Sequence, residues 1–201
     1  MSIFFLDIET KPDELLIDIF KANVKPSKTL KDPKKIEVDI EKKQANYKKS
    51  MSVDQDYCDI VCVGIKELNQ KGRLYSIEDM ETWFKNYEDA TIVTFNGKSF
   101  DIPIIIKVGA KKDLKLPYKS LVEMTQRFKP SRHIDLMQKL AFDNFSDRKS
   151  LDTYLRIYLG TQKDTLGDEF FATATEDEII KHCIEDLQFT EDLFKKFRFF
   201  V

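Results

Sequence analysis

Three short segments contain the residues best suited to chemistry, and all three are acidic. In the first, residues 5–10 (FLDIET), two acids are separated by a single residue. Alternate side chains of an extended chain point to the same side, so we expect the carboxylates of Asp7 and Glu9 to project together. Two carboxylates that end an apolar strand are costly unless they meet water or cations. Oxygen ligands of this kind bind hard ions such as Mg²⁺ and Mn²⁺.

The second segment, residues 94–101 (TFNGKSFD), contains an acid at a junction between a strand and a helix. The strand is expected to end at Asn96 and Gly97, and Asp101 is expected to open the helix that follows. Two structural roles compete with a catalytic one. Asp is common near the N-terminus of a helix, where it caps free amides. Asn is equally common as a simple turn residue.

The third segment, residues 182–186 (HCIED), places a histidine four residues before an acid. On a helix these positions share one face, so His182 and Asp186 are expected to point together. A histidine and an acid so spaced are also common on a charged helix surface. The apolar face of the same helix is formed by other residues, so the pair must lie at its border if it acts in catalysis. The members of that apolar face are Ile179, Ile180, Cys183, Leu187 and Leu193.

The elements that position these residues alternate between short apolar runs and longer amphipathic ones, which indicates an α/β domain. Strands are expected at 2–6, 59–66, 73–76 and 91–95, with a turn near 69–72 between the second and third. Helices are expected at 12–20, 33–50, 77–87, 100–108, 134–142, 151–158 and 176–197. Asp32 and Pro33 have the character of a helix start, and Gly160 that of a helix end. Capping of a helix is the preferred role for Asp135.

The length of the chain predicts the number of domains, and its charges are unevenly distributed. The 201 residues suit one domain, spanning 1–201, with a lysine-rich helical insertion near 21–50. The net charge is −2, but residues 21–50 hold ten lysines against four acids. Residues 164–192 hold ten acids, with Lys163 and Lys181 as nearby counterweights. A basic segment beside an acidic pocket would bind phosphates and concentrate metal ions, although an ordinary solvated helix face explains the lysines equally well.

The cysteine count and the hydropathy argue against a disulfide-stabilised protein, a zinc protein and a membrane protein. Cys58, Cys62 and Cys183 are too few for a disulfide framework and read as small buried apolar residues. With two histidines in the chain, a zinc site of thiolates and imidazoles is not expected, and any metal should be a hard ion bound through oxygen. No apolar run approaches the roughly 18 residues of a membrane span. An intracellular, cytoplasmic protein with no membrane contact is therefore expected.

Taken in order, the three acidic motifs resemble those of the DEDD superfamily of 3′→5′ exonucleases. The likeness is greatest to the predicted exonucleases related to the proofreading domain of family B DNA polymerases. It covers nearly the whole chain and includes residues 31–36 (KDPKKI), 132–136 (RHIDL) and the stretch from Ser150 to Gly160.

The resemblance implies a ribonuclease H-like α/β fold with a mixed sheet of about five strands flanked by helices. It implies hydrolysis of phosphodiester bonds from the 3′ end of single-stranded DNA, with release of nucleoside 5′-monophosphates. Two divalent cations, Mg²⁺ or Mn²⁺, would be held by the carboxylates of Asp7, Glu9, Asp101 and Asp186. The terminal nucleotide would be positioned by Thr10, Asn96 and Phe100.

His182 departs from the family pattern. Members of the tyrosine type have Tyr-x-x-x-Asp in the third motif, and members of the histidine type have His five positions before the Asp. In this chain the histidine stands at the tyrosine spacing. His182 is expected either to accept the proton of the attacking water or to orient that water, since the pKa of an ordinary histidine is near 6.5.

Three other functions fit the same residues. An exoribonuclease would use the same carboxylates and differ in its contacts to the 2′-hydroxyl. A catalytically silent nucleic-acid-binding module would share the fold, and an endonuclease of the broader ribonuclease H-like group would share the metal site. The expected partner is nucleic acid, with DNA favoured over RNA, and a replication or repair protein is a further expected partner.

Overall fold

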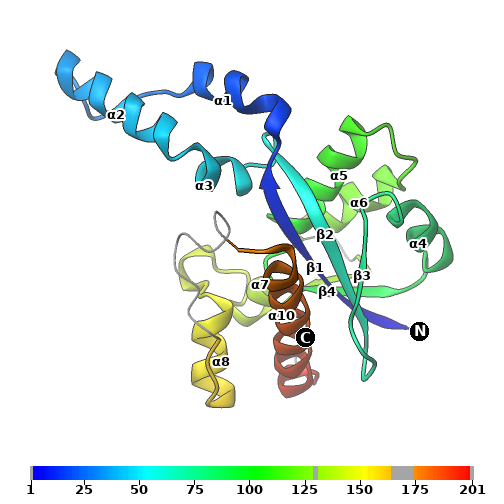
Figure 1. The fold of residues 1–201 in the computed structure, drawn as a ribbon. Helices are drawn as coiled ribbons and strands as arrows, with labels where there is room; N and C mark the ends of the chain where they lie inside the picture. The colour runs from blue at the N-terminus through cyan, green and yellow to red at the C-terminus, as the bar shows by residue number, and fades with distance from the viewer. Residues whose placement is uncertain (1, 129–130, 164–173, 200–201) are drawn as a thin grey trace.

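A five-stranded mixed sheet forms the centre of the computed structural model, which describes residues 2–128, 131–163 and 174–199 (Figure 1). The strand order is β3-β2-β1-β4-β5. β1 pairs antiparallel with β2 and parallel with β4, β2 pairs antiparallel with β3, and β4 pairs parallel with β5. The strands are β1 (Ile3–Pro12), β2 (Cys58–Glu67), β3 (Arg73–Tyr75), β4 (Thr91–Thr94) and β5 (His133–Asp135).

Helices cover both faces of the sheet, as Figure 1 shows. One face is covered by α4 (Met80–Asn86), α5 (Asp101–Lys111) and α6 (Tyr118–Thr125). The other is covered by α7 (Leu136–Leu140), α8 (Leu151–Leu159) and α10 (Glu176–Phe197). Each face has its own buried apolar cluster.

 The expected helices at 151–158 and 176–197 are thus confirmed, and α8 spans Leu151–Leu159.

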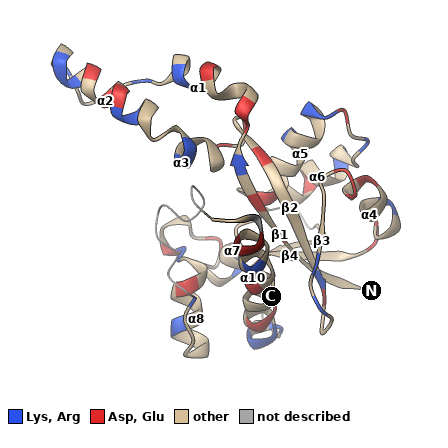
Figure 2. Ribbon diagram, in the orientation of Figure 1, with Lys and Arg blue, Asp and Glu red and all other residues tan. Residues whose placement is uncertain are grey.

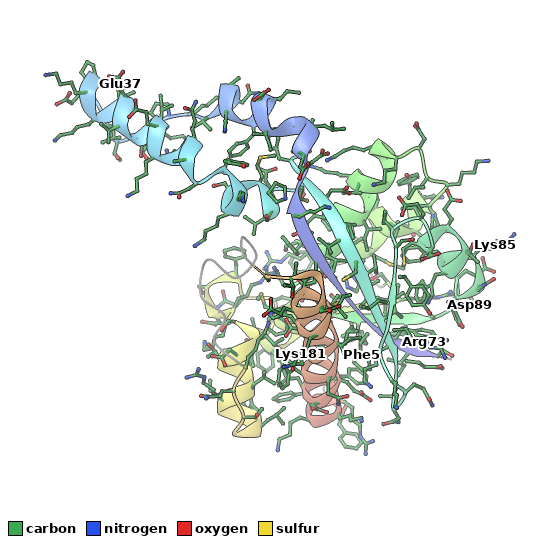
Figure 3. All side chains as sticks on the ribbon, in the orientation of Figure 1. Phe5, Glu37, Arg73, Lys85, Asp89 and Lys181 are labelled. Atoms are coloured by element: carbon green, nitrogen blue, oxygen red, sulfur yellow. The ribbon has the colours of Figure 1, made fainter. Side chains whose placement is uncertain are left out.

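Alternation along β1 determines what each face receives. Phe4, Leu6 and Ile8 belong to the cluster beneath α4 and α5. Phe5 points to the opposite face, where its ring packs edge-on against that of Phe194 of α10 with 5.5 Å between centroids. Figure 3 shows Phe5 beside this helix. Because side chains two residues apart share a face, β1 sends Asp7 and Glu9 toward α10 as well.

Several expected boundaries were wrong, and the reasons are physical. β1 continues to Pro12 instead of ending at 6, because its pairing with β2 persists through a register shift after Glu9. The expected strand at 59–66 is confirmed as part of β2. Residues 133–135 form a strand, where a helix over 134–142 was expected, because they pair with β4. The helix at 118–125 was not anticipated.

The lysine-rich part of the chain forms an arm, defined here as residues 17–52. It contains α1 (Ile17–Asn23), α2 (Pro33–Ala45) and α3 (Tyr47–Ser52), and a short 3₁₀ turn at Glu14–Leu16 precedes it. The expected helices at 12–20 and 33–50 are therefore displaced and divided. In Figure 1 the arm extends away from the sheet at the end of β1. α2 buries no residue, in keeping with the few core contacts expected of this segment.

Three further observations concern membrane spans, the cysteines and the acid-rich segment. None of the helices in the described ranges is long and apolar enough to cross a membrane. The three cysteines are buried and are not joined in a disulfide, as expected of small apolar residues. Residues 164–173 of the acid-rich segment lie outside the described part of the chain.

Candidate active site

The first two carboxylates lie within β1, on the face that packs against α10. Asp7 pairs with Gly64 of β2 and Glu9 pairs with Cys62, and the register shifts immediately after Glu9. Asp7 is partly exposed, whereas Glu9 is buried with 5% of its surface exposed. Strand alternation therefore sends both acids into one space, as expected from the sequence.

The third carboxylate, that of Asp101, enters from the junction of β4 and α5. Asp101 is the first residue of α5 and is 3% exposed. Its carboxylate is stabilised in the charged form by its own backbone amide and by that of Ile8 in β1. The second of these contacts ties the start of α5 to the strand that contains Asp7. Burial nevertheless dominates and raises the pKa of Asp101 to about 8.

The loop before Asp101 is held in one conformation by specific residues. Asn96 has a φ of 70°, and Gly97 lies so close to the side chain of Thr94 that a Cβ atom would collide with it. The carboxylate of Asp135 accepts hydrogen bonds from the amides of Asn96 (3.1 Å) and Lys98 (3.0 Å). It also caps α7 by accepting from Gln138 N at 3.1 Å. Asp135 thus combines the expected capping role with support of the loop.

The last helix supplies the remaining pair of predicted residues. α10 begins at a capping box between Thr175 and Glu178. One turn further, His182 Nδ1 and Glu9 Oε1 lie 2.8 Å apart and share a hydrogen bond. The helix can approach this closely because β2 has a glycine at position 64, where a Cβ would collide with Cys183 Sγ.

Asp186 lies one turn after His182 and faces both the ammonium group of Lys163 and the other carboxylates of the site. Its Oδ2 accepts from Lys163 Nζ at 2.5 Å. Its Oδ1 is buried and has no hydrogen-bond partner among the described residues. A buried oxygen without a donor is costly, so this atom marks a place where a ligand is needed.

The carboxylates raise one another's pKa. The pKa of Asp7 is raised well above its usual value by burial and then by the charges of Asp101, Glu9 and Asp186, and Lys163 opposes this only in part. Burial also raises the pKa of Glu9, against the hydrogen bond and charge of His182. Without a cation, the cluster therefore favours the protonated forms of these acids.

The donor atoms fit a hard divalent cation. Oxygen ligands of Asp7 and Glu9 and the sulfur of Cys183 lie within 4.8 Å of one another. The sulfur is not expected to take part, because its hydrogen bond to Cys62 and its burial raise the pKa of the Cys183 thiol. The remaining ligands are carboxylates, which Mg²⁺ and Mn²⁺ prefer. The Asp186 oxygen that has no partner among the described residues also supports a site for such a cation.

The predicted site residues fall into two groups. The structure brings together the side chains predicted for the catalytic and metal site, namely Asp7, Glu9, Asp101, His182 and Asp186. The three residues predicted to position the nucleotide lie beside them in β1 and before α5. Thr10 is buried and donates to Ser52 O at 2.5 Å. Asn96 and Phe100 are partly exposed.

Lys163 is the contributor to the site that sequence reasoning did not assign. It lies after α8, and its backbone amide donates to Asp152 Oδ1 at 3.0 Å, which fixes the residue to that helix. Its position directly before an acid-rich stretch was a usable signal, because a lysine there has many carboxylates to neutralise. The sequence did not show which of them it would contact.

Comparisons with known proteins agree with this architecture. A sequence model of the RNase_H_2 family, described as RNase_H superfamily, matches residues 35–198. The fold is similar to that of a family B DNA polymerase from the hyperthermophilic archaeon Pyrobaculum calidifontis, with a TM-score of 0.60 and 14% sequence identity over 98% of this chain. The chain spans 24% of that polymerase. No curated protein sequence matches the chain. The expected ribonuclease H-like fold is confirmed.

Proposed function

Because the chain belongs to the RNase_H superfamily, we propose that it is a metal-dependent 3′→5′ exonuclease of the DEDD kind. Its substrate would be single-stranded DNA, and its products nucleoside 5′-monophosphates. One observation carries the proposal: the carboxylates of Asp101, Glu9 and Asp186 all act electrostatically on that of Asp7, and a buried oxygen of Asp186 has no partner among the described residues. A purely structural cluster would be expected to have its buried oxygens satisfied.

The metal ligands in this proposal are the four carboxylates of Asp7, Glu9, Asp101 and Asp186. When bound, two cations would activate water for attack and stabilise charge on the leaving 3′-oxygen. The protein's own contribution is to hold the ligands in place before binding. Glu9 is fixed by His182 and Asp101 by the amide of Ile8, so little reorganisation is needed.

His182 would act on the attacking water. Its Nδ1 is held by Glu9 at 2.8 Å, which fixes the plane of the ring. An imidazole fixed in this way can orient a water or accept its proton, whereas a tyrosine at the same spacing would mainly orient. The side chain is 11% exposed, which is compatible with access by one water.

The terminal nucleotide would lie against Asn96 and Phe100, which precede Asp101. Both are partly exposed, and the loop that holds them is anchored by Asp135. Thr10 would contribute less directly, because its hydroxyl already donates to Ser52 O. We therefore assign Thr10 to the support of the strand end beside Glu9.

The proposal is tested with single-stranded DNA labelled at its 5′ end and incubated with Mg²⁺, Mn²⁺ or chelator. We expect a ladder that shortens from the 3′ end only when metal is present. Asp186→Asn should abolish it, and Glu185→Gln, a change at the neighbouring, partly exposed acid, should not. Absence of degradation under every condition would instead favour a silent binding module.

Two matched substrates separate the alternatives within the fold. A circular single strand has no 3′ end, so an exonuclease leaves it intact and an endonuclease cuts it. Labelled DNA and RNA of one sequence distinguish the proposed activity from that of an exoribonuclease. Faster loss of the RNA would overturn the assignment of DNA as substrate.

A further inference from the structure

The arm is rooted directly beside the candidate active site. Ser52, the last residue of α3, accepts the hydrogen bond from the Thr10 hydroxyl, and Thr10 follows Glu9 in β1. Met51 of the same helix is completely buried. The base of the arm is therefore fixed to the strand that contains two of the four carboxylates.

The surface of the arm is basic and is largely unused within the protein. Figure 2 shows lysines along its helices. Two of the four acids between 21 and 50 have structural roles: Asp32 caps α2, and Asp39 contacts both Ser27 N and Lys43 Nζ at 2.8 Å. In the described part of the chain, no ion pair is formed by seven exposed lysines, namely Lys25, Lys28, Lys31, Lys34, Lys35, Lys42 and Lys48.

The geometry of α2 separates part of this charge from the remaining acids. Lys35 and Lys42 are two turns apart and lie within about 20° of each other around the helix axis. Glu37 and Glu41 lie about 100° or more from both lysines. The same helix exposes one large apolar side chain, Val38, which is too little for an apolar protein interface.

We propose that the arm binds the phosphate backbone of the substrate strand, several nucleotides 5′ of the end held at the carboxylates. This inference rests on the proposed exonuclease function. Lysine ammonium groups contact phosphates as point charges without reading bases, which suits an enzyme that must degrade any sequence. α2 is about 20 Å long, from its 13 residues and the helical rise. That length corresponds to about six phosphates of a stacked strand.

The arm also supplies positive charge beside the carboxylates of the candidate active site. The carboxylates of the candidate site offer no positive charge to a polyanion, and the whole chain has a net charge of −2. A basic surface next to the cluster attracts the strand before the terminal phosphate reaches the carboxylates. Attraction and cleavage are thus assigned to different parts of the molecule.

The test measures the salt dependence of binding, which needs no catalysis. The arm variant replaces Lys31, Lys35, Lys42 and Lys48 by Gln. The control variant makes the same change at four exposed lysines far from the arm, namely Lys71, Lys85, Lys119 and Lys196. Figure 3 shows Lys85 at the side of the molecule opposite the arm residue Glu37.

Fluorescence anisotropy of a labelled 20-nucleotide DNA is followed in EDTA over a series of KCl concentrations. Each lost phosphate contact reduces the slope of log K against log salt by about 0.7 for a single strand, so the arm variant should lose about 3 from its slope. The control variant should keep the native slope. Equal slopes for the native protein and both variants, with thermal unfolding unchanged, would overturn the proposal.

Turnover on substrates of different length separates this proposal from that of the exonuclease. The arm variant should lose at least about tenfold in kcat/KM on the 20-nucleotide strand, and the loss should shrink on a strand of four nucleotides. If binding depends on the arm but no DNA is degraded, the proposed exonuclease function is refuted and the proposed role of the arm stands. If the arm variant degrades the long strand at the native rate, only the proposed role of the arm is refuted.

Discussion

Raising the pH should destabilise the metal-free protein, and Asp101 is a main cause. The pKa of this buried carboxyl is raised from 3.8 to about 8, chiefly by burial and further by the charges of Asp135 and Glu9. The folded state therefore keeps a proton that the unfolded state releases near pH 4. Between these two values the folded state binds more protons, so stability falls as pH rises. The contribution is complete below the unfolded pKa and is lost as pH passes through about 8.

The size of the effect follows from linkage. One proton held by the folded state alone corresponds to about 1.4 kcal/mol per pH unit. Close to the folded pKa the slope declines, so Asp101 should account for a loss of about 1 kcal/mol between pH 7 and pH 8. This interval avoids His133, because burial lowers the pKa of that histidine from 6.5 and makes it act in the opposite direction at lower pH.

The assay is urea unfolding in EDTA at pH 7.0, 7.5 and 8.0, for the native protein and for Asp101→Asn. The asparagine keeps an acceptor oxygen for the amide of Ile8 but cannot ionise, so its stability should depend less on pH by about 1 kcal/mol over this interval. Glu185→Gln serves as the control and should follow the native protein. Added Mn²⁺ should stabilise the native protein more at pH 8 than at pH 7, because its ligands must be deprotonated. Identical pH dependence for native protein and Asp101→Asn would refute the reasoning.

Three further changes test other contacts of the site. His182→Ala should lower turnover by about 10²- to 10⁴-fold while a thermal shift with Mn²⁺ persists, and a native rate would exclude its role toward water. Lys163→Met removes the ammonium group that lies 2.5 Å from the Asp186 carboxylate. In scanning fluorimetry this variant should melt at a lower temperature than the native protein without metal, and Mn²⁺ should raise its melting temperature by more. An equal rise for both proteins would contradict this. Gly64→Ala should cost about 1–3 kcal/mol in urea unfolding, because its Cβ would collide with Cys183, and turnover should fall as α10 is displaced. An unchanged stability would mean that the helix adjusts freely.

Local signals were sufficient for much of the fold and for the central acids. The predicted bounds of α10 agree with the observed helix because its amphipathic period runs without interruption from Glu176 to Phe197. Gly160 has a φ of 64° and ends α8, as a glycine after a helix is expected to do. The common direction of Asp7 and Glu9 follows from strand alternation alone.

Features that depend on distant partners could not be predicted in this way. β5 has three residues, too few for a periodic signal, and it exists through its pairing with β4. The contact between His182 and Glu9 joins residues 173 positions apart. Lys163 is similar, since nothing local to it identifies Asp186 as its partner. Asp135 has one contact of each kind. Its cap of α7 is local and was expected, whereas its hydrogen bonds to the 96–98 loop join distant residues and were not expected.

The close approach of α10 at Gly64 has a consequence for protein synthesis. His182 and Asp186 lie on the helix that is made last among the described elements, whereas Asp7 and Glu9 lie on the strand that is made first. A nascent chain on the ribosome would display the first acids long before the helix that completes the site has emerged. The proposed hydrolytic activity would therefore arise only when this helix docks onto the sheet, and a truncated product that lacks the helix would be inert.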